Sequence, residues 1–262
     1  MNSSSGIPSR NLCIHRQKRF WVLCSLKFLV SFLFVILKIQ KKNNVVIGMG
    51  AEKLNHFKTI VFIIMVGSVF FYTYLVGKFK QERLFYGILV MFLIAFSLYS
   101  FVLLPNLEKL QPQYATSWLA CHEGSKGNFA YSCMMIWKNW VSVFFFCIAE
   151  FWGQYCIIIL FWGVANELFS RQEAKKTYHY FIASGCFGGV AGTLLLRWVA
   201  QDLVGKSQED QFLGISNLVG LTSIATTLTL LCLYHWIKRV FFNQKQVKKP
   251  QKSPHSFSFA KG

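Results

Sequence analysis

The feature that most constrains this chain is an almost uninterrupted apolar stretch from Trp137 to Leu168, which reads WKNWVSVFFFCIAEFWGQYCIIILFWGVANEL. The stretch is 32 residues long, and a helix needs about 20 apolar residues to cross a bilayer. The sequence therefore predicts a helix over this stretch that crosses a membrane and projects beyond it.

A single carboxylate, Glu150, lies near the middle of this stretch, and Gln154 follows one turn later. At 100° per residue, Asn139, Glu150 and Gln154 fall within about 60° of one another, so we expect one polar stripe on the helix. A carboxylate in hydrocarbon costs about 2.5 kcal/mol or more, so Glu150 should face other helices or a watery cavity. A substrate or ion site is the favoured interpretation, and a protonated or paired structural glutamate is the alternative.

The composition supports a membrane protein, because 54% of the residues are hydrophobic and only 15% are charged, against about 25% charged in soluble domains. Six apolar runs are long enough to span a bilayer. They are Phe20–Leu37, Ile60–Val76, Leu84–Leu104, Trp137–Leu168, Tyr178–Val199 and Phe212–Trp236. The predicted fold class is thus an all-α membrane protein, a six-transmembrane-helix bundle.

The predicted organisation is one membrane domain between two tails. Residues 1–18 form a basic cytoplasmic tail, residues 19–237 the six-helix domain, and residues 238–262 a second basic tail that we expect to be disordered and cytoplasmic. Most Lys and Arg residues lie in the two tails and in the 77–83 and 170–177 turns. The positive-inside rule then places both termini in the cytoplasm.

The segment Lys38–Lys58 is expected to be a basic loop on the opposite side, where it breaks this rule. Attraction of an anionic substrate is one reason for such an exception, and a misplaced first span is another. The net charge of +18 does not indicate nucleic-acid binding, because no basic stripe is interleaved with exposed aromatic residues on a soluble domain.

Two further patterns point to packing. Lys27 interrupts the first apolar run, and we expect it to face the bundle in a structural role. The fifth run contains two G-x-x-x-G spacings, Gly185/Gly189 and Gly188/Gly192, which let helix backbones approach closely. A glycine-rich phosphate cradle is the sharper alternative, but no Lys-Ser/Thr pair follows, so packing is favoured.

The long loop over residues 105–130 predicts a short amphipathic helix that begins after Pro112 and ends near Cys121. A disulfide between Cys121 and Cys133 is an open alternative to two free thiols. The pair Cys121-His122 has no second ligand pair at metal spacing, so we assign no metal and no cofactor. No Ser/His/Asp set, H-E-x-x-H motif or paired carboxylates lie in or near the spans, which argues against an enzyme.

The most specific motif is AEFWGQYCIIILFWGVANE at 149–167, followed by EAKKTYHYF at 173–181. It resembles the ATP/ADP translocase family of nucleotide transporters, which read A-E-L-W-G, F-W-G-F-A-N and E-A-K-R-F-Y-P-L-F at these places. The resemblance extends through the run Gly50-Ala51-Glu52 and covers most of residues 20–200, the N-terminal half of such a carrier. Members occur in plastids, obligate intracellular bacteria and microsporidia, and a bacterial inner membrane is favoured here over a plastid envelope.

The resemblance implies substrate-binding roles for Lys41, Lys138 and Glu150, to which the polar stripe adds Gln154. The R-D-T-K-D signature of the family aligns with Lys38-Ile39-Gln40-Lys41-Lys42, which keeps its basic positions and lacks both acids. The lysine that matches Lys41 is implicated in nucleotide binding, although a solvated basic loop is an equally good interpretation of this segment. Lys138 aligns with an arginine of the family, so the resemblance implies a cation that faces phosphate. The alternative is that Lys138 anchors the helix at the lipid headgroups beside Trp137 and Trp140.

The related carriers have about twelve spans in two halves, like major-facilitator carriers. The family glutamate that matches Glu150 acts with a glutamate and a lysine from the second half, both absent here. The implied function is nucleotide transport, most simply ATP:ADP antiport by a half-length carrier in the lipid bilayer, and a homodimer would complete it. The alternative is a degenerate or truncated paralogue that does not transport.

Overall fold

The computed structural model describes residues 7–50, 54–122, 129–169 and 171–242, and every regular element within these ranges is helical. The elements are α1 (Ile7–Met49), α2 (Leu54–Lys78), α3 (Gln81–Leu98), η2 (Tyr99–Leu103), α4 (Gln113–Cys121), α5 (Phe129–Lys138), α6 (Trp140–Trp152), η4 (Gly153–Phe161), α7 (Trp162–Leu168), α8 (Arg171–Asp202), α9 (Gln208–Ile237) and η5 (Lys238–Phe242). Those labelled η are π-helical. The predicted all-α class is confirmed.

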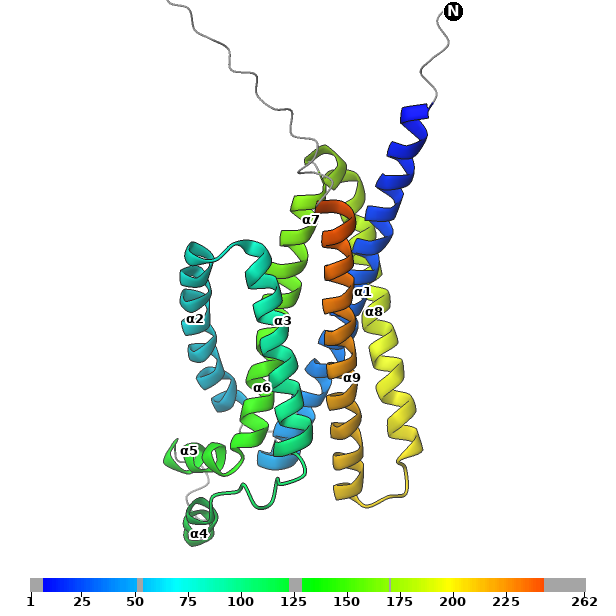
Figure 1. Cartoon of the computed structure of the whole chain (residues 1–262). Helices are drawn as coiled ribbons and strands as arrows, with labels where there is room; N and C mark the ends of the chain where they lie inside the picture. Colours follow the sequence, from blue (N-terminus) through cyan, green and yellow to red (C-terminus); the bar gives the residue numbers. More distant parts are fainter. Residues whose placement is uncertain (1–6, 51–53, 123–128, 170, 243–262) are drawn as a thin grey trace, which may run out of the picture.

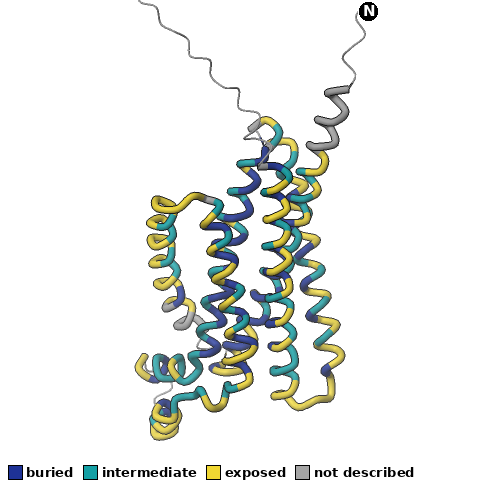
Figure 2. The backbone as a smooth tube through the Cα atoms, in the orientation of Figure 1, coloured by how far each residue is buried: buried dark blue, intermediate teal, exposed yellow. Residues whose placement is uncertain are grey.

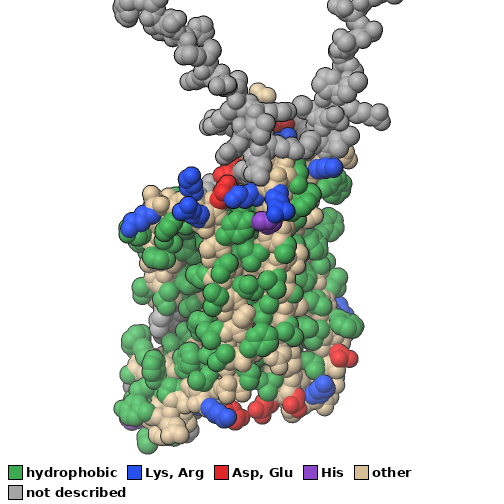
Figure 3. Space-filling view, viewed as in Figure 1, with side chains coloured by type: hydrophobic (Ala, Val, Ile, Leu, Met, Phe, Trp, Pro, Cys, Tyr) green, Lys and Arg blue, Asp and Glu red, His purple; other side chains and the backbone are tan. Residues whose placement is uncertain are grey.

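Six stretches of helix are long and apolar enough to cross a membrane, as predicted. They are Gln17–Met49, Val61–Lys78, Glu82–Leu103, Trp140–Leu168, Lys175–Asp202 and Gln208–Phe241. Figure 3 shows the apolar side chains in a broad belt across the visible face, with most charged side chains gathered at its two ends. The protein is accordingly a multi-pass membrane protein.

Helix α1 is the element around which the bundle is arranged, because it contacts α6, α8 and α9 along its length (Figure 1). Trp152 of α6 lies fully buried at this junction and donates a hydrogen bond from its indole nitrogen to the carbonyl of Val30 at 3.2 Å. Its ring also contacts Phe92 and Phe96 of α3, with centroids 5.1 and 5.8 Å away. The aromatic core therefore joins the first, third and fourth spans.

The glycine-rich face of α8 packs directly on α1. A Cβ atom at Gly188 would lie 2.3 Å from the carbonyl oxygen of Phe28, and one at Gly192 would lie 2.8 Å from that of Phe32. Only glycine permits such an approach of two helix backbones. The predicted packing role of this motif is confirmed, and because the face is used inside the bundle it is not free for a partner.

The prediction of a basic loop from Lys38 to Lys58 is wrong for most of its length. Helix α1 continues to Met49, and Gly50, with φ of 83°, follows its end. The polar residues that resemble a loop in the sequence lie in the helix instead, and three of them, Gln40, Lys41 and Asn44, bond to side chains of other elements. Of the five cations assigned to this loop, Lys38, Lys41 and Lys42 lie in α1 and Lys58 lies in α2, whereas Lys53 is outside the described residues. This supports the explanation that the first span was misplaced.

The predicted single helix from Trp137 to Leu168 is divided. Helix α5 ends at Lys138, Asn139 separates it from α6, and the helix widens to the π form at Gly153. The ring of Phe34 occupies the space that a side chain at Gly153 would need, 2.7 Å from an ideal Cβ. The continuous polar stripe expected from Asn139 to Gln154 is thus broken at both ends of α6.

The segment after the third span matches its prediction, because α4 follows Pro112 and ends at Cys121. Cys121 and Cys133 are both free thiols. In Figure 1, α4 and α5 lie across the lower end of the bundle, whereas α1 starts and η5 finishes towards the upper end. That both termini are cytoplasmic stays a prediction, and residues 243–262 of the second tail lie outside the described residues.

Helix α2 stands apart from the rest of the bundle. Only 6% of its apolar window is buried, and Figure 2 shows it almost wholly exposed or half-buried. Large exposed side chains such as Phe62, Phe70 and Phe71 cover it. Exposed aromatic and aliphatic residues on a spanning helix are suited to contact with lipid chains.

The close contact between α1 and α8 can be tested by a substitution that adds one methyl group to α8. Replacing Gly188 with Ala should destabilise the protein by about 1–3 kcal/mol, because the added Cβ has no room beside a backbone carbonyl. The matched control is Gly87→Ala in α3, where nothing lies within 4 Å and the change should be neutral or slightly stabilising. Thermal unfolding of both variants in detergent is the measurement, and equal melting temperatures would contradict this packing.

Candidate functional site

Three neighbouring polar side chains on the second half of α1 are buried: Gln40, Lys41 and Asn44 are 2%, 5% and 1% exposed. Their positions in the sequence place them within little more than one helical turn. Buried polar groups in a spanning helix are costly unless they find partners. Each of the three finds one on a different element.

Lys41 forms an ion pair with Glu150 of α6, and its ammonium donates a hydrogen bond to the carboxylate oxygen Oε1. The lysine side chain is 7% exposed and the glutamate side chain 34%. The ammonium also lies 4.9 Å from the centre of the Phe146 ring, one turn before Glu150. The expectation that Glu150 has a polar neighbour in the bundle is confirmed, and that neighbour is the lysine that the family resemblance singled out.

The other two residues form a polar cluster with α9 and η2. Gln40 donates from Nε2 to Asn44 Oδ1 at 2.8 Å and to the hydroxyl of Ser216 at 2.9 Å. Asn44 donates from Nδ2 to the hydroxyl of Tyr99 at 3.2 Å. The amide oxygen of Gln40 is buried without a hydrogen-bond partner in the described part of the chain. This cluster fixes the register of α1 beside Lys41.

A pocket of about 310 Å³ opens beside Glu150, between α2 and the α6–η4 segment. Glu150 and the exposed Gln154 form its polar side with Lys58, which lies near the start of α2. Its apolar lining is Val61, Phe62, Met65, Val66, Val69 and Phe146. The pocket itself has one cation, one carboxylate and one amide, and the ammonium of Lys41 lies directly behind the carboxylate. Charge-assisted hydrogen bonds from the two ammonium groups are suited to an anion.

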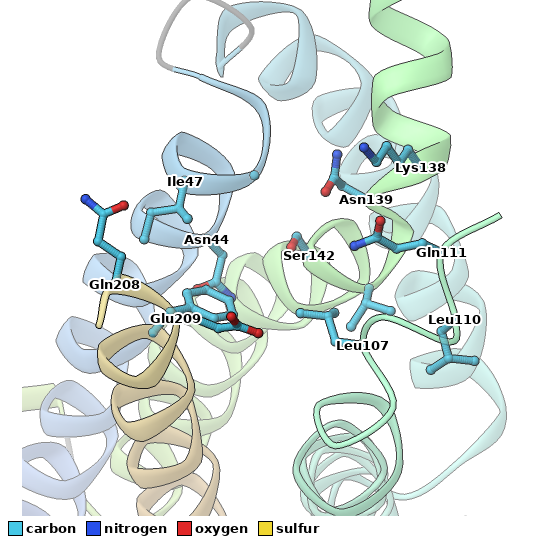
Figure 4. Close-up of a pocket in the computed structure, with 13 residues that line it drawn as sticks. Asn44, Ile47, Leu107, Leu110, Gln111, Lys138, Asn139, Ser142, Gln208 and Glu209 are labelled. Atoms are coloured by element: carbon cyan, nitrogen blue, oxygen red, sulfur yellow. The ribbon is translucent and has the colours of Figure 1, made fainter. Parts of the chain in front are cut away.

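A second pocket, of about 340 Å³, lies at the other side of α6 and contains Lys138 (Figure 4). Residues of α1, the segment before α4, the α5–α6 junction and the start of α9 surround it. They are Asn44, Ile47, Gly48, Leu107, Leu110, Gln111, Lys138, Asn139, Val141, Ser142, Gln208, Glu209 and Phe212. We call it the end pocket.

The structure therefore brings together three of the four predicted site residues. Glu150 and Gln154 line the pocket beside α2, and Lys41 joins them through its ion pair with Glu150, whereas Lys138 lines the end pocket with Asn139. Whether any of the four binds substrate stays a prediction.

Sequence reasoning did not identify the polar cluster as a unit. Asn44 and Tyr99 carried no signal at all, because each is isolated in its own segment. Ser216 had a weak signal, since it lies in one of the more polar spans, which contains several Ser and Thr residues. Only the fold shows that these side chains meet.

Lys27 faces inward, as expected, and is 8% exposed. Its ammonium lies 4.7 Å from the centre of the Phe161 ring and 5.7 Å from that of Trp162. Within the described ranges no ion pair is formed by Lys27, and no group of three His, Cys, Asp or Glu side chains could hold a metal ion.

Comparison with known proteins gives a consistent result. The family model described as TLC ATP/ADP transporter matches residues 11–260. The chain is 27% identical over 252 residues to ADP,ATP carrier protein 1 of Chlamydia pneumoniae, covering 91% of this chain and 48% of the relative. It is 32% identical over 168 residues to ADP,ATP carrier protein 1 of Rickettsia typhi, with 64% and 33% coverage.

A plant protein, ADP,ATP carrier protein 2, chloroplastic, of Arabidopsis thaliana is 28% identical over 238 residues, covering 87% of this chain and 37% of the relative. The chain thus spans half or less of the length of these relatives. No solved structure matches it significantly.

The ion pair can be tested by removing its two charges one at a time and then together. Glu150→Gln should lower the melting temperature more than Lys41→Met, because it leaves a buried ammonium unpaired, whereas the carboxylate left by the other change is one-third exposed. The double variant should lose less stability than the sum of the two single changes. Thermal unfolding of the three variants in detergent measures this coupling.

The exposed pair Lys238–Glu82, with side chains 36% and 42% exposed, provides the control. Glu82→Gln there should change stability by at most about 1 kcal/mol. Strict additivity of the Lys41 and Glu150 changes would show that the two side chains do not interact.

Proposed function

The chain belongs to the TLC ATP/ADP transporter family, and from this we propose that it moves adenine nucleotides across a membrane, exchanging ATP for ADP. The relatives that it resembles are named ADP,ATP carriers. The observation that carries the proposal is the buried Lys41–Glu150 pair beside an open pocket. A buried lysine in a spanning helix needs an anionic partner, and here it has one carboxylate, which an anionic substrate could replace.

The proposed recognition step is an exchange of partners at Lys41. Nucleotide phosphates carry several negative charges, and an ammonium that meets them lowers the cost of leaving water. When phosphate reaches Lys41, it replaces Glu150 as the acceptor, and the carboxylate turns towards the pocket that it already lines. Gln154 and Lys58 lie in the same pocket and supply further hydrogen-bond donors.

Movement of the substrate would follow the alternating-access scheme of secondary carriers, in which one helical unit rocks against another around a central site. In that scheme the site residues lie at the interface of the two units. Glu150 and Gln154 fit this position, because they are partly or fully exposed on a spanning helix. Lipid chains satisfy neither side chain.

Uptake of radiolabelled ATP into proteoliposomes loaded with ADP tests the proposal. Lys41→Gln should reduce the uptake rate at least about tenfold, since one charge-assisted hydrogen bond to phosphate is lost. The matched control is Lys42→Gln, which removes the same charge from the next, exposed position and should retain most of the rate. Equal losses would mean that only the overall charge matters, and no uptake by the unaltered chain would favour a non-transporting paralogue.

We further propose that a second copy of this chain covers the face that carries Gln154. The chain matches at most about half of each carrier compared above, and those carriers resemble two-unit transporters in which a partner unit lies over the site. The glycine-rich face of α8 is occupied by α1 and does not compete for this role.

Crosslinking tests this assembly. A cysteine at Gln154 should give a disulfide-linked dimer on mild oxidation in membranes. The same change at Ile182, which is 56% exposed on α8, should give none beyond the unaltered protein. Equal crosslinking at both positions, or a monomer that transports at the full rate, would refute the dimer.

A further inference from the structure

The end pocket is separate from the Lys41–Glu150 site, and nothing in the proposed transport step uses it. Its volume of about 340 Å³ lies at the lower end of the range of about 300–1,000 Å³ that small-molecule sites occupy. Figure 4 shows Ser142 near its middle, with Lys138 and Glu209 on opposite sides. Such sites typically combine an apolar wall with a few polar groups that fix the ligand.

Ser142 is the first sign of a ligand. It is 8% exposed, yet among the described residues its hydroxyl has no hydrogen-bond partner, and it lines the pocket. Because this hydroxyl is open to the pocket and has no partner in the described part of the protein, it is free to hydrogen-bond a polar group bound there. The same side chain lies in the first turn of α6, close to the backbone N–H groups with which that helix begins.

Lys138 and the start of α6 make this side of the pocket electropositive. No side chain caps the first turn of α6, because the amide of Asn139 donates back to the carbonyl of Met135 at 3.0 Å. The first N–H groups of a helix attract negative charge. Lys138 is half-buried beside them and forms no ion pair with a described acid. An ammonium, a hydroxyl and a helix start together match a phosphate group.

The opposite side of the pocket has a different character. Glu209 in the first turn of α9 is exposed and lines the pocket next to Gln208. A carboxylate there would repel a second phosphate, and it would accept hydrogen bonds from ammonium or hydroxyl groups. Between the two sides the wall is apolar, made by residues such as Leu107, Val141 and Phe212.

We infer that the end pocket binds a phosphate ester, with its phosphate at Lys138 and Ser142 and a hydrogen-bond donor of its organic part at Glu209. Two compounds share this chemistry. One is a nucleotide with a single phosphate, whose ribose hydroxyls would reach the carboxylate, and the other is the headgroup of an ethanolamine phospholipid. The inference does not depend on transport, because it uses none of the residues at the Lys41–Glu150 site.

Isothermal titration of the purified protein in phospholipid-free detergent tests this site, with AMP and O-phosphoethanolamine as probes. Lys138→Met and Ser142→Ala should each weaken binding, the lysine change at least about tenfold because a charge-assisted hydrogen bond is lost. Lys109→Met is the matched control, since Lys109 is exposed at the same end of the bundle and lines an adjoining pocket that shares Glu209 but contains neither Lys138 nor Ser142. Glu209→Gln should weaken binding of whichever of the two probes the unaltered protein binds, and Glu108→Gln should not.

Repeating the titrations with Lys41→Gln separates the two sites. Binding that persists in this variant and disappears with Lys138→Met belongs to the end pocket, even if the protein transports nothing. Binding of AMP alone would identify a nucleotide site, and binding of O-phosphoethanolamine alone would identify a lipid headgroup site. Absence of binding by both probes, or equal losses with Lys109→Met and Lys138→Met, would overturn the inference. Melting temperatures of the variants confirm that each is folded.

Discussion

A polar side chain inside a bilayer needs a partner, and the second half of α1 is built on this requirement. Gln40, Lys41 and Asn44 would each destabilise a lone spanning helix, but Ser216, Glu150 and Tyr99 meet them from three different elements. These bonds restrict both the rotation and the height of α1 relative to α6 and α9. The hydrophobic effect does not do this between helices in lipid, because lipid chains are as apolar as the helices. The position of α1 in the bundle is therefore determined by a few polar contacts and by the close packing of Gly188 and Gly192 of α8 against it.

The same requirement shapes the proposed transport site. A buried ion pair stabilises little beyond what its two charges lose on leaving water, but breaking it by removing one partner is costly. A substrate phosphate that takes the place of the Glu150 carboxylate keeps Lys41 paired throughout. The partial exposure of Glu150 matters here, since the released carboxylate can meet water in the pocket that it lines. The pair is thus stable at rest and exchangeable in the presence of an anion.

The number and approximate limits of the spans could be predicted from the sequence, because length and apolarity alone decide whether a helix can cross a bilayer. The end of α1 could not be predicted, since Gln40, Lys41 and Asn44 look like loop residues until their partners on other helices are known. The break at Asn139 and the π-helix from Gly153 were equally hidden. At Gly153 the absence of a side chain leaves room for the ring of Phe34, which comes from a distant segment. For the site, Glu150 was identifiable as a lone charge in an apolar stretch. Its pairing with Lys41, 109 residues earlier in the chain, is supplied by tertiary structure.

The weak attachment of α2 has a mechanical consequence. This helix forms the outer wall of the pocket beside Glu150, yet almost none of its apolar window is buried against the bundle. Its contacts with lipid would be nearly unchanged by a tilt of a few degrees, whereas the α1–α8 seam resists any displacement. The packed helices of the bundle are thus rigid, whereas α2 can move relative to them, and the position of α2 determines the width of the pocket. Bilayer thickness and lateral pressure act directly on α2, because lipid surrounds most of it. The lipid composition of the membrane would therefore influence the shape of the pocket beside Glu150.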